Sequence, residues 1–287
     1  MTNSKFRVSL VIPVYNEESY LALCLESIAA QTVRPFEVIV VDNNSTDSTV
    51  AVAQRFPFVT VLHEPRQGVV YARDCGFNAA RGDIIGRTDG DTILSPDWVA
   101  QLQQAFAEPT VDATSGTVDY RDIGFKAAFD VIDTRFRHYL ANRMEKVGEL
   151  FLYGVTMGIR RSAWESVRGE LCHEREFAED LDLAAHLSHL NFQASFTPMM
   201  RATIAPRQAA SGPREFFRYV WSCPHTYIKH GMVSQRYMYA MVVFVIACYL
   251  PIRLLYAGYN PMTQRFSLAH IFRSDVRARV SPVSELI

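Results

Sequence analysis

The sequence predicts an α/β fold, with a mostly parallel sheet covered by helices on both faces and a helical C-terminal appendage. Three observations lead to this prediction. Short apolar runs rich in β-branched residues alternate with helical patterns through the first 110 residues. These runs are apolar throughout, which is typical of parallel strands buried on both faces. Hydrophobic residues make up 49% of the 287 residues, so the chain has material for a core and is not intrinsically disordered.

The expected elements alternate in chain order. The expected strands, which are short apolar runs, are residues 8–14, 36–41, 59–62, 83–87, 113–118, 151–159 and 193–203. The expected helices, which carry apolar residues at helical spacing, are residues 17–30, 49–56, 71–80, 96–106, 125–145, 178–190, 213–230 and 236–256. Ser95 followed by Pro96 predicts a helix start, because serine suits the N-cap and proline suits the first helical position.

Charge divides the chain near residue 210. Residues 201–287 contain 11 Lys and Arg against three Asp and Glu, a net charge of +8. Residues 1–200 contain 18 against 27, a net charge of −9. We therefore expect a domain of residues 1–210 and a basic, aromatic and apolar helical region of residues 211–287. An acidic body suits a metal site or serves solubility alone, and a basic tail suits an anionic surface, either a membrane or a nucleic acid.

One apolar segment, residues 237–252, lies between Arg236 and Arg253. A helix of this length spans about 24 Å, less than the roughly 30 Å of a bilayer's hydrocarbon core. A helix that continues to Tyr259, with its arginines reaching toward the headgroups, would cross. The segment is open to three interpretations, namely an interfacial or marginally spanning helix, a buried core helix, and a dimer contact.

Composition and missing motifs exclude several classes of protein. The five scattered cysteines, with no C-x-x-C pair, do not form a disulfide scaffold, argue against a cysteine zinc site and fit a reducing cytosol. The eight histidines show no metal-ligand spacing. The short polar start does not resemble a targeting peptide. The absence of G-x-G-x-x-G, Walker A, G-x-S-x-G and H-E-x-x-H motifs disfavours dehydrogenases, P-loop NTPases, serine hydrolases and zincins.

The strongest chemical signal is Asp89-Gly90-Asp91, directly after the expected strand 83–87. Ligands of such sheets bind beyond the carboxyl ends of strands. Two carboxylates separated by one residue can converge on a hard cation such as Mg²⁺ or Mn²⁺, which stabilises a leaving diphosphate. The competing interpretation is a plain surface turn, since Asp-Gly is common in turns.

Two further segments can contact a nucleoside. Asp42 ends a buried strand and can accept hydrogen bonds from a base or ribose. Tyr15 can stack on a base and Glu17 can bond a ribose. Taken alone, these segments also fit an ordinary polar loop and an acidic helix start.

Two more segments carry charged groups suited to a reaction. Asp180, beside Glu179, can act as a general base toward a substrate hydroxyl. Arg73, which follows the flexible Gly68, can bind a diphosphate. The alternatives are an acidic first helical turn for the pair and an ion pair with a nearby acid for Arg73.

The order and spacing of these segments are more specific than any one of them. They are Pro13-x-Tyr15-Asn16-x-Glu18, Val41 to Asp47, Gly68 with Ala72-Arg73, Gly82-Asp83 leading to Asp89-Gly90-Asp91, and Glu179-Asp180. Over about residues 6–205 the chain resembles the inverting glycosyltransferases of family 2. The resemblance implies a GT-A fold with a Rossmann-like sheet, a nucleotide-sugar donor with UDP-sugars favoured, a divalent Mn²⁺ or Mg²⁺, and inversion at the anomeric carbon.

The resemblance also implies roles for donor-side residues. Pro13, Tyr15 and Glu17 would line the nucleoside pocket. Asp42 would contact the base, and Arg73 would lie near the diphosphate or ribose.

On the reaction side, the resemblance implies that Asp89 meets the ribose or sugar and, with Asp91, the metal. Asp180 would be the catalytic base, with Glu179 beside it for orientation or acceptor contact. Residues 154–161 would line the acceptor side.

Two departures from the family pattern bear on function. Asp74 stands where many members have Asn, which leaves its role open. The Gln-x-x-Arg-Trp signature of processive synthases is absent and only one apolar segment occurs, so transfer of a single sugar is favoured.

The expected function is therefore transfer of one sugar to a glycan or lipid-linked acceptor, for envelope polysaccharide or glycolipid synthesis. The expected location is the cytoplasmic face of the inner membrane, with peripheral or single-segment attachment and no nucleic-acid partner. The alternatives are a non-catalytic nucleotide-sugar-binding protein, a membrane assembly protein and a nucleotidyltransferase.

Overall fold

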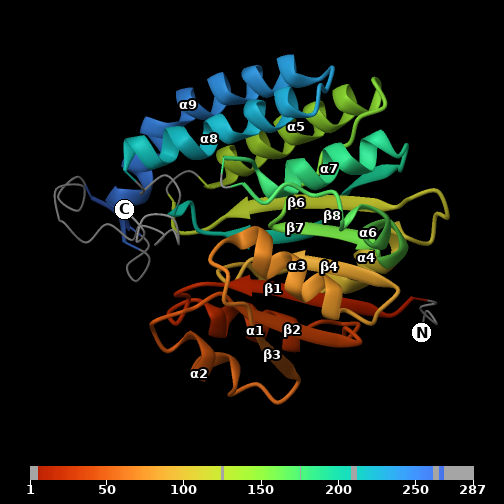
Figure 1. Cartoon of the computed structure of the whole chain (residues 1–287). Helices are drawn as coiled ribbons and strands as arrows, with labels where there is room; N and C mark the ends of the chain where they lie inside the picture. The colour runs from red at the N-terminus through yellow and green to blue at the C-terminus, as the bar shows by residue number, and fades with distance from the viewer. Residues whose placement is uncertain (1–5, 124–125, 175, 208–211, 261–264, 268–287) are drawn as a thin grey trace.

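The structure is a computed structural model of the chain and describes residues 6–123, 126–174, 176–207, 212–260 and 265–267. Its centre is a sheet with strand order β3-β2-β1-β4-β7-β6-β8-β5 (Figure 1). The strands are β1 (Val8–Val14), β2 (Glu37–Asp42), β3 (Val59–His63), β4 (Ile84–Thr88), β5 (Ile93–Leu94), β6 (Ala113–Tyr120), β7 (Thr156–Arg160) and β8 (Ala194–Ile204). A small hairpin, β9 (Tyr259–Asn260) and β10 (Arg265–Phe266), stands apart.

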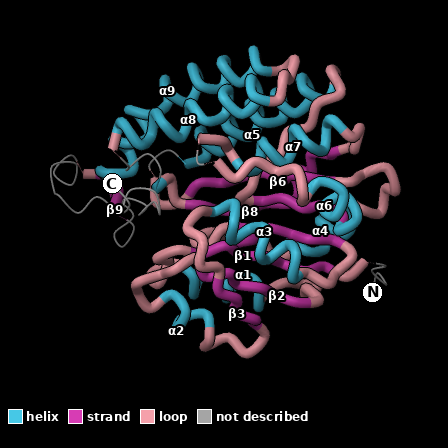
Figure 2. The backbone as a smooth tube through the Cα atoms, in the orientation of Figure 1, coloured by secondary structure: helices cyan, strands magenta, loops and turns pink. Residues whose placement is uncertain are grey.

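The helices lie between these strands and in a C-terminal layer. They are α1 (Leu21–Ala29), α2 (Thr49–Ala53), α3 (Val69–Ala79), α4 (Trp98–Ala105), α5 (Lys126–Glu145), α6 (Arg161–Val167), α7 (Glu179–His189), α8 (Pro213–Lys229) and α9 (Gln235–Gly258). Figure 2 shows strands and helices alternating through the first half of the chain. The predicted α/β class is confirmed.

Strands β3, β2, β1 and β4 run parallel, so their carboxyl ends share one edge of the sheet. Beyond β4 the sheet is mixed, because β7 runs antiparallel to both β4 and β6, and β5 runs antiparallel to β8. Strand β8 pairs with β6 in parallel, with a register shift between Ser115 and Thr117. The parallel character expected of the sheet is therefore concentrated in its N-terminal half.

Helices cover both faces of the sheet, as predicted. In β1, Leu10 and Ile12 pack with α1 and α4 on one face, whereas Val11 packs with α3, α6 and α7 on the other. Successive strand residues point to opposite faces, so a strand buried on both is apolar throughout. Helix α3 approaches closely, because a Cβ on Gly76 would lie 2.3 Å from Cγ1 of Val11 and 2.9 Å from Cγ2 of Val41.

Helix α7 lies between the sheet and an outer layer of α5, α8 and α9 (Figure 1). Leu181 of α7 shares a core with Leu140 of α5, Tyr227 of α8 and Met238 of α9. The Tyr227 hydroxyl donates a hydrogen bond to the Leu150 carbonyl at 3.0 Å. The C-terminal helices are thus packed onto α7, the helix that lies between β7 and β8 in the chain. The division of the chain at residue 210 remains a prediction, and residues 208–211 and 268–287 lie outside the described ones.

Several element boundaries differ from prediction for local reasons. Helix α1 begins at Leu21, because the segment from Glu17 forms a turn in which the Tyr20 amide donates to the Glu17 carbonyl. The predicted cap at Ser95 and Pro96 is wrong, because these residues form a turn and Asp97 is the N-cap of α4.

Other differences concern short elements. The expected strand 151–159 begins only at Thr156. Strand β5 and helix α6 were not predicted, because two and seven residues are too few to show a periodic pattern. Residue 125, the expected start of the long helix, lies outside the described residues.

Candidate functional site

The site begins where three parallel strands end. Strand β1 ends at Val14, β2 ends at Asp42, and β4 ends one residue before Asp89. The Asn43 amide donates to the Val14 carbonyl at 2.9 Å, which ties the first two strand ends together. Since parallel strands end at one edge, residues far apart in sequence converge there, and this edge is where ligands of such sheets bind.

Asp89 and Asp91 lie on a tight turn and are 7% and 6% exposed. Glycine is required between them, because a Cβ on Gly90 would lie 2.9 Å from Cγ1 of Val14. Burial raises the pKa of the neighbouring Cys24 thiol, and the charges of Asp91, Asp89 and Glu17 raise it further. The carboxylates of Asp91, Asp89 and Glu17 therefore all act on the buried Cys24 thiol. Binding of one cation by Asp89 and Asp91 remains a prediction.

Arg207, which follows β8, supplies positive charge to this cluster. Its Nη1 lies 2.8 Å from Oε2 of Glu17 and 2.9 Å from Oδ2 of Asp91, and all three side chains are buried. Its guanidinium also lies 4.2 Å from the ring centroid of Tyr20. Sequence reasoning missed Arg207, because its partners lie 116 and 190 residues away along the chain and no local pattern marks it.

Arg87 joins the turn to the first residue of α7. Its Nη2 lies 3.3 Å from Oδ1 of Asp89, and its Nη1 lies 2.6 Å from Oε1 of Glu179. Burial opposes the charged form of Arg87, but Glu179 and Asp89 outweigh it and raise the pKa. Sequence reasoning missed Arg87 too, although an arginine inside an otherwise buried strand is itself a signal, since buried charges are paired.

Gly154, before β7, accommodates this arginine and binds Asp180. A Cβ at Gly154 would lie 2.2 Å from Nη1 of Arg87. Its amide donates to Oδ2 of Asp180 at 2.9 Å, while the Leu181 amide donates to Oδ1 at 2.9 Å. The backbone thus fixes the Asp180 carboxylate at the start of α7.

The surroundings of Asp180 raise the pKa of its carboxyl. Burial raises its pKa to about 6, and repulsion by Glu179 adds to the rise. The Gly154 amide and the charge of Arg87 limit the rise. At neutral pH the group is therefore ionised but basic enough to accept a proton from a hydroxyl in a transition state.

The buried Tyr153 hydroxyl is influenced by the carboxylates of both Asp89 and Asp180. Burial raises its pKa to about 12, Arg137 lowers it, and the charges of Asp89 and Asp180 raise it. The Arg137 guanidinium lies 3.7 Å from the Tyr153 ring centroid and is bonded to Asp133 at 2.6 Å. Neither Tyr153 nor Arg137 is marked by a motif, and tertiary packing alone brings α5 to the site.

The nucleoside-side residues lie at the ends of β1 and β2. Pro13 is buried within β1, and Tyr15 follows the strand in a partly buried position. Oδ1 of Asp42 accepts a hydrogen bond from the Ser45 amide at 3.2 Å, and Oδ2 lies 3.3 Å from Nδ1 of His63.

A hydrogen bond joins Asn43 to the adjacent loop at Gly68. Oδ1 of Asn43 accepts a hydrogen bond from the Gly68 amide at 2.7 Å. Gly68 has a φ of 145°, a conformation that side chains rarely adopt, which explains glycine before α3. The structure therefore brings this loop beside the end of β2.

Arg73 is fully buried between two carboxylates. Its Nη2 lies 2.8 Å from Oδ1 of Asp74, and its Nη1 lies 3.2 Å from Oε2 of Glu179. The other oxygen of Asp74 lies 2.9 Å from Nε2 of His173. Contact between Arg73 and a diphosphate remains a prediction, and it would require the side chain to leave these partners.

The sequence profile of glycosyl transferase family 2 matches residues 9–168, more than half of the chain. The chain belongs to glycosyl transferase family 2. The matched residues include the turn of Asp89 and Asp91 and the end of β2. Glu179, Asp180 and Arg207 lie beyond them, so their places in this family 2 site rest on the geometry described above.

Curated relatives agree with this membership. The putative glycosyltransferase EpsH of Bacillus subtilis (strain 168) is 31% identical over 181 residues, which cover 58% of this chain and 52% of EpsH. The glycosyltransferase GlyG of Streptococcus pneumoniae serotype 4 is 32% identical over 148 residues, 50% of this chain and 46% of GlyG. This family 2 chain therefore spans about half the length of these relatives.

Solved structures share the GT-A fold with this family 2 chain. The mannosyltransferase PcManGT from Pyrobaculum calidifontis, in complex with GDP-Man and Mn²⁺, has a TM-score of 0.62 at 20% identity, over 98% of this chain and 78% of PcManGT. TarS 1–349 of S. aureus, in complex with UDP-GlcNAc, has a TM-score of 0.57 at 17% identity, over 92% of this chain and 77% of TarS 1–349. The predicted family and fold are confirmed.

Proposed function

We propose that this family 2 chain transfers one sugar from a nucleotide-diphosphate sugar to an acceptor hydroxyl, with inversion at the anomeric carbon. The observation that carries the proposal is the bridge formed by Arg87, which contacts Asp89 on the donor side and Glu179 on the acceptor side. One buried guanidinium thus sets the spacing between the two halves of the site. A single displacement depends on such positioning of donor and acceptor.

The donor would lie along the ends of β1, β2 and β4. Tyr15 and Pro13 would line the nucleoside pocket, with Glu17 toward the ribose and Asp42 toward the base. PcManGT and TarS were solved with GDP-Man and UDP-GlcNAc. We favour a UDP-sugar for this chain, and both nucleotides belong in the test.

Asp91 and Asp89 would hold Mn²⁺ or Mg²⁺. Two buried carboxylates on one turn fit such a hard cation, whose preferred ligands are oxygens. When bound, the cation supplies charge stabilisation for the departing nucleoside diphosphate. Arg207 contacts Oδ2 of Asp91, so the guanidinium and a cation compete for this carboxylate.

Asp180 would act as the catalytic base. It takes the proton of the acceptor hydroxyl as that oxygen bonds to the anomeric carbon and the bond to the nucleoside diphosphate breaks. Glu179, held by Arg73 and Arg87, would orient the acceptor side. The Gly154 and Leu181 amides keep the Asp180 oxygens in position, which is the preorganisation that proton transfer requires.

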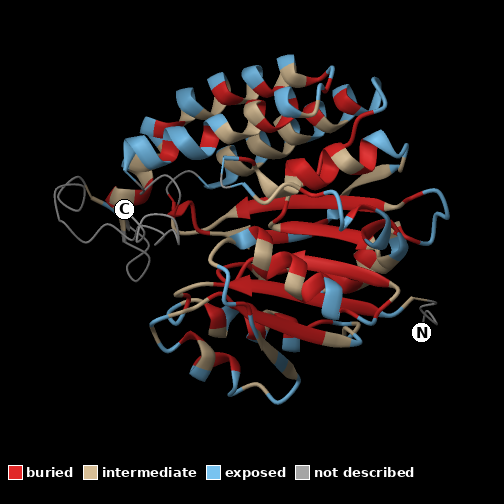
Figure 3. Ribbon diagram, viewed as in Figure 1, coloured by how far each residue is buried: buried red, intermediate tan, exposed pale blue. Residues whose placement is uncertain are grey.

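The C-terminal helices support a membrane-proximal acceptor. Helix α9 is long and apolar enough to cross a membrane, and 17% of its most apolar stretch is buried. The outer faces of α8 and α9 carry many exposed residues (Figure 3). We infer peripheral or single-segment attachment at the cytoplasmic face of the inner membrane, and a lipid-linked or envelope glycan acceptor.

A donor panel tests this function. UDP-, GDP- and dTDP-sugars are each offered with Mn²⁺, Mg²⁺ or EDTA, and donor binding and release of the nucleoside diphosphate are measured. We expect one donor to bind in a metal-dependent manner. Asp91→Asn should remove that dependence, and Glu108→Gln, which changes an exposed acid at a distance from the site, should keep it. Failure of every donor with folded protein would overturn the proposal in favour of a non-catalytic role.

A further inference from the structure

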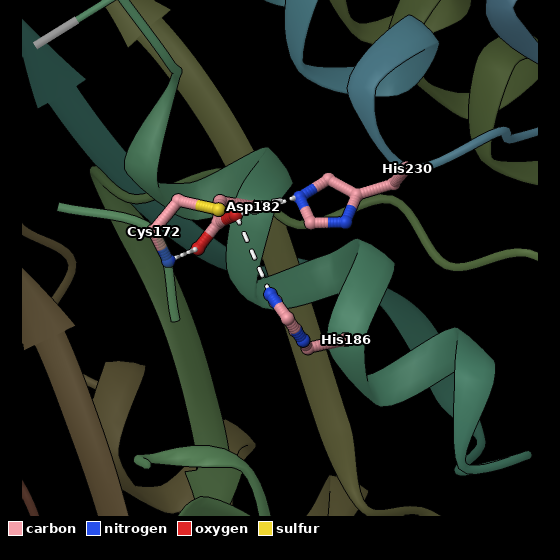
Figure 4. Close-up of side chains that lie close together, drawn as sticks. All are labelled: Cys172, Asp182, His186 and His230. Atoms are coloured by element: carbon pink, nitrogen blue, oxygen red, sulfur yellow. Dashed lines mark hydrogen bonds and ion pairs between the residues drawn. The ribbon is translucent and has the colours of Figure 1, made fainter. Parts of the chain in front are cut away.

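Four side chains with metal-binding atoms converge beside the first two turns of α7 (Figure 4). Asp182 and His186 are one helical turn apart on α7, Cys172 precedes this helix, and His230 caps the C-terminus of α8. One ligand atom from each residue lies within 4.8 Å of the others. The cluster shares no residue with the donor or acceptor side of the site.

The distances between ligand atoms suit a tetrahedral ion. Oδ1 of Asp182 lies 2.8 Å from Nε2 of His230 and 3.6 Å from Nε2 of His186, and Nε2 of His230 lies 3.9 Å from Sγ of Cys172. Ordinary zinc bond lengths place neighbouring ligands of a tetrahedron roughly 3.3–3.8 Å apart. Small side-chain shifts therefore bring all four atoms onto one ion.

Hydrogen bonding alone does not account for the cluster. Oδ2 of Asp182 accepts the Cys172 amide at 3.0 Å, and Oδ1 meets His230. Nε2 of His186 is buried and has no hydrogen-bond partner, because 3.6 Å to Asp182 is too long for one. The buried Nε2 of His186 lies close to a thiol, a carboxylate and a second imidazole. This arrangement indicates a site for an electron-pair acceptor such as a metal ion.

We propose that Cys172, Asp182, His186 and His230 bind one Zn²⁺ ion in a closed, structural site. The Cys172 amide fixes one oxygen of Asp182 and leaves the other to bind the metal. Thiolate and imidazole ligands favour Zn²⁺ over Mg²⁺ or Mn²⁺, which separates this site chemically from the turn of Asp89 and Asp91. Four protein ligands fill a tetrahedron, so the ion supplies cross-linking and not catalysis.

The ion would cross-link three segments of the chain. It joins the end of α8 and the segment after α6 to α7, two residues beyond Asp180. The ligands lie on three segments and are up to 58 positions apart in the chain, so short cysteine and histidine spacings do not predict the site.

The first test measures metal content in the full chain purified without a histidine tag. After dialysis we expect about one zinc per chain, falling below about 0.1 in His186→Asn and in Cys172→Ser. His225→Asn, also on α8, is the matched control and should keep the zinc. Asp91→Asn should keep it too, because that residue belongs to the other metal site.

The second test keeps the proposal falsifiable if a variant does not fold. In the unmodified chain, Co²⁺ in place of zinc should give the absorption of a tetrahedral thiolate complex. A chelator should lower the melting temperature, and zinc should restore it. A chain without zinc, zinc retained by both ligand variants, or a Co²⁺ spectrum without the thiolate band would each overturn the proposal. None of these readouts depends on sugar transfer.

Discussion

At the scale of single residues, the site depends on buried arginines that no motif marks. Arg87 is buried between Asp89 and Glu179, and Arg207 is buried between Glu17 and Asp91. Removing one partner of a buried ion pair leaves an uncompensated charge, which is more costly than losing a surface pair. These arginines therefore set both the geometry and the charge balance in which the carboxylates act.

Replacing Asp180 with asparagine tests the catalytic base. The amide cannot accept a proton, so turnover should fall by about 10²–10⁴-fold while donor binding is kept. Initial rates and donor calorimetry measure the two quantities separately. Glu174→Gln, an exposed acid before α7, serves as the control. If Asp180→Asn retained most of its turnover, another group would be the base.

The pH profile tests the same group without mutation. Burial raises the pKa of Asp180 to about 6, with Glu179 adding and Arg87 opposing the rise. A base works when deprotonated, so kcat/KM should decline as pH falls through about 6 and reach a plateau above it. The measurement is kcat/KM at saturating metal from about pH 5 to pH 8. A flat profile over this range would contradict the assignment.

Arg207→Gln tests the competition between arginine and metal. Removing a positive charge that lies 2.9 Å from Asp91 should tighten Mn²⁺ binding in the absence of donor by about tenfold or more. Calorimetric titration with Mn²⁺ measures the change. Arg201→Gln, which removes a more exposed arginine paired with Asp119, should leave the affinity unchanged. Equal Mn²⁺ affinities in Arg207→Gln and the unmodified chain would show that the guanidinium does not compete.

At the scale of elements, features that depend on neighbouring residues can be predicted from the sequence, whereas features that depend on contacts between distant segments cannot. The parallel strands β1 to β4 and the position of Asp89-Gly90-Asp91 directly after a strand can be predicted, because apolar runs and strand-end residues are local patterns. The contacts of Arg207 and the cluster of Cys172, Asp182, His186 and His230 cannot be predicted in this way, because their partners come from distant segments. Short elements such as β5 and α6 were missed because too few residues define their period.

The packing of α3 on the sheet gives a stability prediction. In Gly76→Ala, the new Cβ would meet Val11 and Val41 at 2.3 Å and 2.9 Å. Overpacking costs about 1–3 kcal/mol, while alanine regains about 1 kcal/mol of helix propensity, so a net loss of up to about 2 kcal/mol is expected. Urea unfolding measures it. Gly169→Ala, which meets nothing within 4 Å, is the control, and equal stability of both variants would refute close packing at Gly76.

At the scale of the whole molecule, the chain presents two unlike ends. The α8–α9 layer lies at one end of the molecule and the α2–β3 region at the other (Figure 1). The layer exposes large apolar side chains, among them Val243 at 68% and Leu250 at 63%. An exposed apolar helix in a basic part of the chain is typical of a surface that contacts anionic lipid.

Vesicle binding tests this orientation. The double change Val243→Glu and Leu250→Glu should lower binding to anionic vesicles by about tenfold or more, because it replaces two apolar contacts with charges. Phe58→Glu, between α2 and β3, is the matched control and should bind normally. Co-sedimentation with phosphatidylglycerol vesicles measures binding. No binding by the unmodified chain would indicate that the face contacts protein instead.

The close approach of Arg87 to Gly154 limits which substitutions residue 154 can accept. The same residue leaves room for Nη1 of Arg87 and offers its amide to Asp180. Every other amino acid carries a Cβ, so each single mutation at this codon disturbs both functions together. We therefore expect variation around Asp180 to occur at neighbouring positions, with glycine kept at residue 154.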